Sequence, residues 1–294
     1  MPSVFCPAKL NLFLAVTGRR PDGFHDLVSI AAPVNWGDEL EASADARDGF
    51  RLACNDPAVP TGADNLVIKA AMALAAVGGP KGANFRLEKR IPIEAGLGGG
   101  SSDAVAALRV LNALSGEKVS QAALVALAAL LGSDCGLFLA GAPAIMRGRG
   151  ERIELLQPAA TARLVGRRVL IFKPGFGVPT PWAYSRLIES AAYLSTDEAE
   201  ARVAAWLGDA KAPAESILFN SFALPVFAKY PALPALFDRL RARFGLKPAL
   251  SGSGSACFAL LPEREAPSVA EVAADVREAW GASAWVVETR FSGA

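Results

Sequence analysis

Apolar and polar positions alternate near the start of the chain. Within residues 8–16, leucine or valine occupies every second position from Leu10 to Val16, while Lys9 and Asn11 fall on the opposite side of the repeat. A two-residue period is typical of a β-strand, so the pattern predicts a strand on which Lys9 and Asn11 point the same way. The Pro and Gly of residues 20–23 predict a turn, and residues 24–34 form the expected returning strand.

Start and stop signals predict helices in the first half of the chain. Asp64 is the expected N-cap of a helix that ends at Gly78, and Ser120 that of a helix that ends at Gly132. Asp134 directly follows the second stop. Before the first of these helices we expect one short strand within residues 45–60, and between the two helices we expect a strand at residues 85–93 and a helix after a glycine-rich segment. The expected buried face of that helix carries Val105, Leu108, Leu111 and Leu114.

Residues 158–163 show no clear periodicity and predict a crossover between two halves. After it we expect a strand at 169–172, helices up to Phe244, a strand at 257–261, a helix at 268–280 and a strand at 284–289. The second of these strands follows a second glycine cluster, residues 251–255. This order predicts an α+β fold with two domains, residues 1–158 and 159–294.

Composition excludes several classes of protein. The 294 residues are 52% hydrophobic and 20% charged, which suits folded cores, and the net charge of +1 without a basic stripe excludes nucleic acid as a partner. The most apolar window, near residues 122–131, is about half of the ~20 residues that a membrane span needs. Four scattered cysteines and an N-terminus without a signal-like segment predict free thiols in the cytoplasm. His25 is the only histidine, which excludes multi-histidine metal sites.

The strongest candidate for chemistry is the glycine loop, defined as residues 92–102, between a predicted strand and a helix. Glycines admit a ligand close to the backbone, and the N–H groups of a helix N-terminus bind anions. The alternative is a flexible loop. A dinucleotide-binding loop would need Gly or Ala where Ser101 stands, and the chain contains neither a Gly-Lys dipeptide nor a G-x-S-x-G motif.

Residues 92–104, with the sequence PIEAGLGGGSSDA, resemble the phosphate loop of GHMP kinases. Further segments resemble one branch of that superfamily, the kinases of the non-mevalonate isoprenoid pathway that phosphorylate 4-diphosphocytidyl-2-C-methyl-D-erythritol. They are PAKLNL at residues 7–12, RPDGFHDL at 20–27, KPG at 173–175 and SGSGSACF at 251–258. The likeness runs in order from Pro7 to about Leu261. It implies a two-domain GHMP kinase fold with the active site in the cleft between the domains.

The resemblance also implies roles for individual residues. It implies that Asp134 is the general base and Lys9 its partner. These roles agree with the chemistry, because an alcohol that attacks a phosphoryl group must lose a proton. The cofactors implied are ATP and Mg²⁺, with the hydroxyl of Ser101 or Ser102 as the candidate metal ligand. The expected ATP-binding residues are Asn65, Pro92, Ile93, Glu94, Ala95, Gly96, Leu97, Gly98, Gly99, Gly100, Ser101 and Ser102.

A cytidylated methylerythritol is the implied small-molecule partner, and no oligomeric state follows from the resemblance. Its expected binding residues are Asn11, Phe24, His25, Thr180 and Tyr184. The family's histidine reads the cytosine edge, and an aromatic at the position of Tyr184 stacks on the ring. Taken alone, Phe24 and Tyr184 suit core packing equally well.

Two positions depart from the family pattern. Glu94 stands where glycine is usual, at the outer edge of the nucleotide loop, and Gly136 stands where proline usually follows the aspartate. Two other functions remain open on the sequence. One is a different GHMP kinase, of the homoserine or mevalonate type, and the other is a GHMP-fold ligand sensor without turnover.

Overall fold

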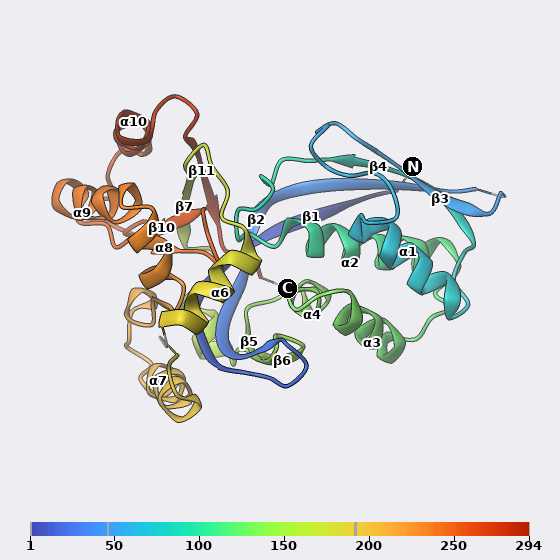
Figure 1. Ribbon diagram of the computed structural model, residues 1–294, viewed down its shortest axis with the longest axis horizontal. Coiled ribbons are helices and arrows are strands. Elements are labelled where there is room, and N and C mark those ends of the chain that lie inside the picture. Colours follow the sequence, from blue (N-terminus) through green and yellow to red (C-terminus); the bar gives the residue numbers. More distant parts are fainter. Residues whose placement is uncertain (1, 46, 191–192, 294) are drawn as a thin grey trace. The chain divides into compact units, whose positions relative to one another are not determined.

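The structure is a computed structural model that describes residues 2–45, 47–190 and 193–293. Figure 1 shows its helices and strands. The strands are β1 (Ser3–Arg19), β2 (His25–Ala44), β3 (Gly49–Cys54), β4 (Gly82–Glu88), β5 (Ala144–Gly148), β6 (Arg152–Leu155), β7 (Arg168–Lys173), β8 (Phe219–Asn220), β9 (Ala249–Leu250), β10 (Cys257–Leu260) and β11 (Trp285–Arg290). The helices are α1 (Leu66–Ala76), α2 (Gly99–Leu114), α3 (Gln121–Leu131), α4 (Cys135–Ala140), α5 (Pro158–Thr161), α6 (Thr180–Ser190), α7 (Thr196–Gly208), η1 (Ala214–Ser216), α8 (Ala223–Lys229), α9 (Ala232–Phe244) and α10 (Val269–Trp280).

The chain divides into two compact units, and both are discontinuous in sequence. Unit 1 comprises the residues up to Ala8, Trp36–Ile93 and Gly98–Gly141. Unit 2 comprises Lys9–Asn35, Glu94–Leu97 and the described residues from Ala142 onward. This division differs from the contiguous halves expected on either side of residue 158. The difference arises because β1, β2 and the glycine loop each contribute residues to both units.

Unit 1 places helices against a sheet. β2 pairs antiparallel with β4, with Leu40 opposite Leu87, and β3 pairs parallel with β4. α1 and α2 lie side by side (Figure 1) and bury their apolar faces with these strands in one core. Leu108 and Leu111 are buried there as predicted, whereas Leu114 is 39% exposed because α2 ends at that residue.

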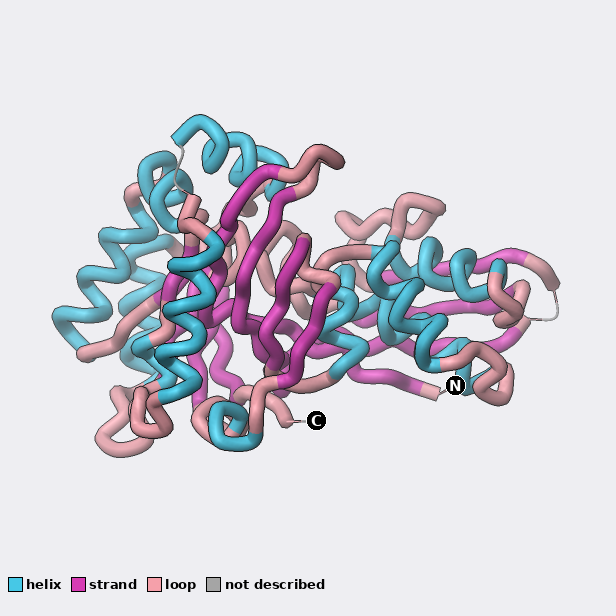
Figure 2. Tube along the Cα trace, turned by 90° about the horizontal axis from the view of Figure 1, so that it is seen from below, coloured by secondary structure: helices cyan, strands magenta, loops and turns pink. Residues whose placement is uncertain are grey.

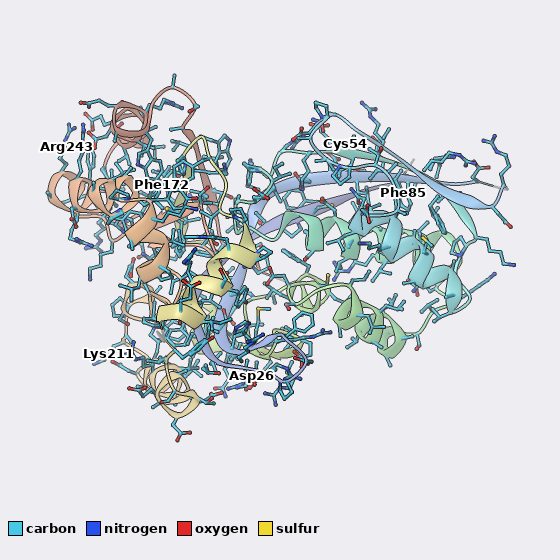
Figure 3. The ribbon with its side chains drawn as sticks, in the orientation of Figure 1. Asp26, Cys54, Phe85, Phe172, Lys211 and Arg243 are labelled. Carbon is cyan, nitrogen blue, oxygen red and sulfur yellow. The ribbon has the colours of Figure 1, made fainter. Side chains whose placement is uncertain are left out.

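Unit 2 contains a second sheet with the strand order β11-β7-β10-β9. Helices lie along one face of this sheet (Figure 2). Phe172 of β7 packs against Phe237 of α9 and Trp280 of α10. Figure 3 shows Phe172 among the side chains of this unit, and Phe85 holds a similar buried position in unit 1. The same unit also contains the pairings of β1 with β8, β2 with β5 and β5 with β6.

Most of the predicted elements are confirmed, and the α+β class is confirmed with them. Three details were wrong. The N-cap of α1 is Asn65 rather than Asp64, because the Asn65 side chain accepts the N–H of Val67. β4 ends at Glu88 rather than at residue 93, and the next N–H groups bond to a side chain instead of a strand. α4, β5, β6 and α5 lie in a stretch for which no helix or strand was predicted.

All four cysteines are free thiols, as predicted. In the described part of the chain, no helix has both the length and the apolar character that a membrane span requires.

Candidate functional site

The first part of the glycine loop, Glu94–Leu97, belongs to unit 2 and lies against the second glycine cluster. The N–H of Ala256 donates to the carbonyl of Ala95 at 3.0 Å, and the Ser251 hydroxyl donates to the carbonyl of Gly96 at 3.0 Å. Gly96 has a φ of +75°, and a Cβ on it would lie 2.1 Å from the Ser251 carbonyl oxygen. Only glycine therefore fits at this contact.

Side chains hold the second glycine cluster in turn. The Asn220 amide donates to the carbonyls of Leu250 at 2.8 Å and Gly252 at 2.9 Å. The hydroxyls of Thr180 and Ser253 are hydrogen-bonded at 3.0 Å. Thr180, an expected substrate residue, thus lies at the second glycine cluster and joins it to the start of α6.

The second part of the glycine loop belongs to unit 1 and opens α2. Gly98 adopts a left-handed φ of +73°, and its carbonyl accepts the N–H of Ser102 at 3.0 Å. The N–H groups of a first helical turn lack acceptors within the helix, and the helix dipole favours anions there. The Ser102 hydroxyl is buried and has no hydrogen-bond partner among the described residues. The first turn of α2 can therefore bind an anion through its N–H groups, and the Ser102 hydroxyl can contact a further part of a ligand.

Several of the expected ATP-binding residues have other structural tasks. Ala95 and Leu97 are 2% and 1% exposed, so their side chains are buried in the protein. Asn65 caps α1 with its carbonyl oxygen and donates from its amide to the carbonyl of Pro60 at 2.6 Å. Ile93 is 45% exposed, and Glu94 adopts a left-handed φ of 50°.

Lys9 lies in unit 2, where its main-chain N–H donates to the carbonyl of Leu97 at 2.9 Å. Its ammonium is buried and donates to the amide oxygen of Asn11, which confirms that the two side chains point the same way. The Asn11 amide donates to the Ser29 hydroxyl at 2.9 Å, and that hydroxyl donates to the carbonyl of Phe13 at 2.6 Å. This chain of hydrogen bonds orients the ammonium of a residue whose main chain lies against the first part of the glycine loop.

Asp134 lies in unit 1, immediately before α4, and its carboxylate does not cap that helix. The next residue connects this segment to the glycine loop, because the buried thiol of Cys135 donates to the carbonyl of Ser101 at 3.8 Å. Burial raises the pKa of the Cys135 thiol to about 12, so the thiol stays protonated and serves as a donor. Gly136, where the family pattern has proline, is the second residue of α4.

His25 and Tyr184 meet in unit 2. Their rings stack with centroids 4.6 Å apart, and the Tyr184 ring also packs edge-on against Phe222 at 4.8 Å. Burial, together with the positive charge of Arg19, lowers the pKa of His25, so the imidazole is neutral near pH 7. Phe24 faces outward and is 49% exposed, with the guanidinium of Arg149 4.8 Å from its ring centroid.

The sequence reasoning missed Tyr193 at this position. Its ring lies 6.2 Å from that of His25, and its hydroxyl is buried. Among the described residues, neither the Tyr193 hydroxyl nor Nε2 of His25 has a hydrogen-bond partner. Unsatisfied buried polar atoms are rare in proteins, and a ligand is one way to satisfy them. No local motif marks Tyr193, because only folding brings it to His25.

A buried group of three charged side chains in unit 1 was missed as well. Lys89 contacts the carboxylates of Asp38 and Asp103, and the side chain of Asp103 is only 4% exposed. Burial raises the pKa of Asp103 above its usual range, with Lys89 opposing the rise and Asp38 adding to it. The one available signal was the position of Lys89 and Asp103 just outside the two ends of the glycine loop. Among the described residues, no group of metal-ligating side chains large enough to hold an ion comes together.

Comparisons with known proteins agree with this arrangement. The sequence pattern of the GHMP kinases N terminal domain matches residues 65–148, and that of the GHMP kinases C terminal domain matches residues 199–280. A 4-diphosphocytidyl-2-C-methyl-D-erythritol kinase of Synechococcus sp. (strain CC9902) is 39% identical over 307 residues, which span 100% of this chain and 98% of the relative. One from Salinibacter ruber (strain DSM 13855 / M31) is 38% identical, over 90% of this chain and 91% of the relative.

Solved structures give the same result. A crystal structure of 4-(cytidine 5'-diphospho)-2C-methyl-D-erythritol kinase matches with a TM-score of 0.75 and 37% identity, covering 98% of this chain and 99% of that chain. A mevalonate kinase structure matches with a TM-score of 0.68 at 13% identity, over 100% of both chains, and this likeness supports the fold alone. The chain belongs to the family of 4-diphosphocytidyl-2-C-methyl-D-erythritol kinases within the GHMP kinases.

Proposed function

We propose that this protein transfers the γ-phosphoryl group of ATP to the 2-hydroxyl of 4-diphosphocytidyl-2-C-methyl-D-erythritol. Relatives that carry the name of this kinase match it over nearly their whole length at 37–39% identity. The observation that carries the choice of acceptor is the stacked pair of His25 and Tyr184, with a neutral imidazole whose Nε2 is unpartnered. Such a pair suits a planar base with a hydrogen-bonding edge.

The nucleotide would bind at the glycine loop. The N–H groups that open α2 would donate hydrogen bonds to phosphate oxygens, and the left-handed Gly98 lets the backbone approach them. Ser101 and Ser102 would help to hold Mg²⁺, and the unpartnered buried hydroxyl of Ser102 fits that role. Bound with ATP, the metal supplies positive charge that offsets the phosphate oxygens.

The chemistry assigned to the side chains is general-base catalysis. Asp134 would take the proton of the attacking hydroxyl, and Lys9 would stabilise the charge on the transferred phosphoryl group. Two features support these roles. Asp134 lies immediately before α4, next to Cys135, whose thiol contacts the glycine loop at Ser101, and a buried hydrogen-bond chain orients the Lys9 ammonium.

An assay of phosphoryl transfer tests the proposal. The purified protein would be incubated with Mg·ATP and a panel of alcohols that includes the cytidylated methylerythritol, mevalonate and homoserine, and ADP release would be measured. We expect turnover with the cytidylated acceptor only. Turnover with mevalonate or homoserine instead would assign another GHMP kinase activity, and ligand binding without any turnover would indicate a sensor.

The general base is tested by Asp134→Asn, which keeps the size of the side chain and removes the base. We expect kcat to fall by about 10²–10⁴-fold while the Kd for ATP is unchanged. Asp238→Asn is the control, since Asp238 is a helix-surface aspartate whose side chain is 76% exposed, and it should leave kcat as it is. Near-normal kcat in Asp134→Asn would refute the assignment.

The aromatic pair is tested by Tyr184→Ala and His25→Ala. The first removes a stacking surface and the second a hydrogen-bonding edge, so each should weaken binding of the cytidylated acceptor by ~1–3 kcal/mol and leave ATP binding unchanged. Trp182→Ala is a matched control on α6, because Trp182 contacts Tyr230 and Lys229 instead. If the affinities for ATP and for the cytidylated acceptor fall by the same factor and the Tm falls sharply, His25 and Tyr184 serve only in packing.

A further inference from the structure

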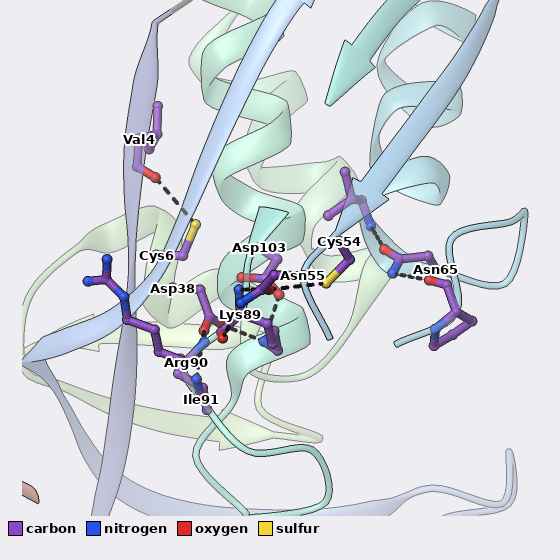
Figure 4. A network of polar contacts seen from close by, with 12 residues as sticks. Val4, Cys6, Asp38, Cys54, Asn55, Asn65, Lys89, Arg90, Ile91 and Asp103 are labelled. Carbon is purple, nitrogen blue, oxygen red and sulfur yellow. Dashed lines mark hydrogen bonds and ion pairs between the residues drawn. The ribbon is translucent and has the colours of Figure 1, made fainter. Parts of the chain in front are cut away.

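Lys89 occupies the centre of the buried charged group in unit 1 (Figure 4). Its ammonium contacts Asp38, and it lies 2.9 Å from Oδ2 of Asp103. The three side chains are only 6%, 0% and 4% exposed, respectively. Burial lowers the pKa of Lys89, but the two carboxylates outweigh it and the net shift is upward, so the ammonium keeps its charge.

The residues around Lys89 hold the segment that leads into the glycine loop. Oδ1 of Asp38 accepts the N–H of Arg90 at 2.5 Å and that of Ile91 at 2.7 Å. The side chain of Asn55 accepts the N–H of Lys89 at 2.7 Å and donates to its carbonyl at 3.3 Å. The backbone is therefore held at three consecutive residues just before the loop begins (Figure 4).

The Lys89 side chain also reaches the far end of the loop. Asp103 is the fifth residue of α2 and directly follows Ser102. A Cβ on Gly99 would lie 2.8 Å from the Lys89 ammonium, so this charge sits beside the first residue of the helix. The same ammonium thus contacts Asp38, which holds the entry to the loop, and Asp103, which stands in its exit.

The charges in this group explain why a cation is needed. Asp103 stands in the region of α2 that the proposed function assigns to the ATP phosphates, and an unbalanced carboxylate there would repel them. Low polarity around a buried pair makes such repulsion stronger than in water. Lys89 supplies the opposing charge from within the protein.

We propose that Lys89 is a positioning residue for nucleotide binding: it ties the entry and the exit of the glycine loop together within unit 1 and offsets the charge of Asp103 beside the phosphate site. This inference rests on the proposed binding of ATP at the glycine loop. Lys89 itself would not touch the reacting atoms.

Three variants separate the two roles of Lys89, which are its contacts with both ends of the glycine loop and the positive charge that offsets Asp103. Lys89→Met removes both and should weaken ATP binding at least tenfold. Lys89→Met combined with Asp103→Asn removes the contacts of Lys89 with both carboxylates and also neutralises Asp103. Asp38 is then the one charged side chain left in the group, and its Oδ1 still accepts the N–H groups of Arg90 and Ile91. The double variant should fold and bind ATP about threefold or more weakly than wild type, yet better than the single variant. Lys89→Arg keeps the charge and should recover most of the affinity.

The control is Arg239→Met in unit 2, which also removes a cation from a buried carboxylate, that of Asp275. It should lower the Tm without changing ATP affinity. The Kd for ATP would be measured by calorimetry at a temperature where every variant is folded, together with the KM for ATP and kcat. A raised Kd and KM for ATP with a smaller change in kcat support the inference.

Two results would overturn it. One is an ATP Kd within twofold of wild type in the double variant, and the other is a loss of ATP affinity in Arg239→Met as large as in Lys89→Met. If Lys89→Met does not fold, the double variant and Lys89→Arg decide the matter. Failure of the ATP binding on which this inference rests looks different, because the wild-type protein would then show no ATP binding at all.

Discussion

The two parts of the glycine loop are held by different kinds of contact. Glu94–Leu97 is held by neutral hydrogen bonds and by close backbone approach to the second glycine cluster. Gly98–Ser102 is held by a helix and by the charged group around Lys89. The glycines of a single run therefore serve different purposes. Gly96 leaves room for another stretch of backbone, whereas Gly98 supplies a left-handed turn into the helix.

The largest effect is expected from Gly96→Ala, which places a methyl group where the backbone of Gly96 packs closely against that of Ser251. The new Cβ would lie 2.1 Å from a backbone oxygen, at a φ of +75°. A left-handed alanine costs ~1–2 kcal/mol and overpacking ~1–3 kcal/mol, so the free energy of unfolding should fall by about 2–5 kcal/mol. Urea denaturation measures it. An unchanged midpoint and m-value would show that the two glycine segments are not packed together as described.

The turn into the helix is tested by Gly98→Val. A β-branched side chain at a φ of +73° is strained and shields the N–H groups that open α2. We expect a folded protein whose free energy of unfolding is lower by about 1–2 kcal/mol and whose ATP affinity is at least tenfold lower. Calorimetry with ATP checks this. Wild-type affinity for ATP in this variant would show that the phosphates do not bind at this end of the loop.

A smaller effect is expected from Ser251→Ala, which removes the hydrogen bond to the carbonyl of Gly96. A net loss of about 1 kcal/mol in the free energy of unfolding is expected for one buried hydrogen bond. Ser185→Ala is the control, because that exposed serine donates to the carbonyl of Trp182 within its own helix. Equal small losses in both variants would mean that the Ser251 contact contributes little to the first part of the loop.

The smallest effect is expected from Gly100→Ala. Its Cβ would meet only the side chain of Leu66, at an ordinary contact distance of 3.5 Å. Because alanine favours helix over glycine by roughly 0.5–1 kcal/mol, the variant should be slightly more stable and bind ATP normally. A raised Tm with an unchanged Kd for ATP would show that Gly100, unlike Gly96, can be replaced by alanine without a steric clash. Lost ATP affinity would instead place a phosphate against Gly100.

Local chemistry was sufficient to predict a strand, the glycine loop and a helix within residues 82–114, although not where the strand ends. An apolar strand, a run of glycines and an alanine-rich segment each favour their structure over a few neighbouring residues. The Ser120 cap and the strand with Lys9 and Asn11 were predictable for the same reason. The grouping of motifs into one family came from resemblance, and full-length relatives confirmed it.

Packing between distant residues lay beyond these local signals. Ser251 and Gly96 are 155 residues apart, and nothing near either one shows that Gly96 must be glycine while Gly100 need not be. β4 ends early because the Asp38 side chain takes the N–H groups that would have continued it. The charged group around Lys89 and the meeting of His25 with Tyr193 arose in the same way. Propensity and periodicity act over one or two turns of chain, whereas these contacts exist only once separate elements have packed together.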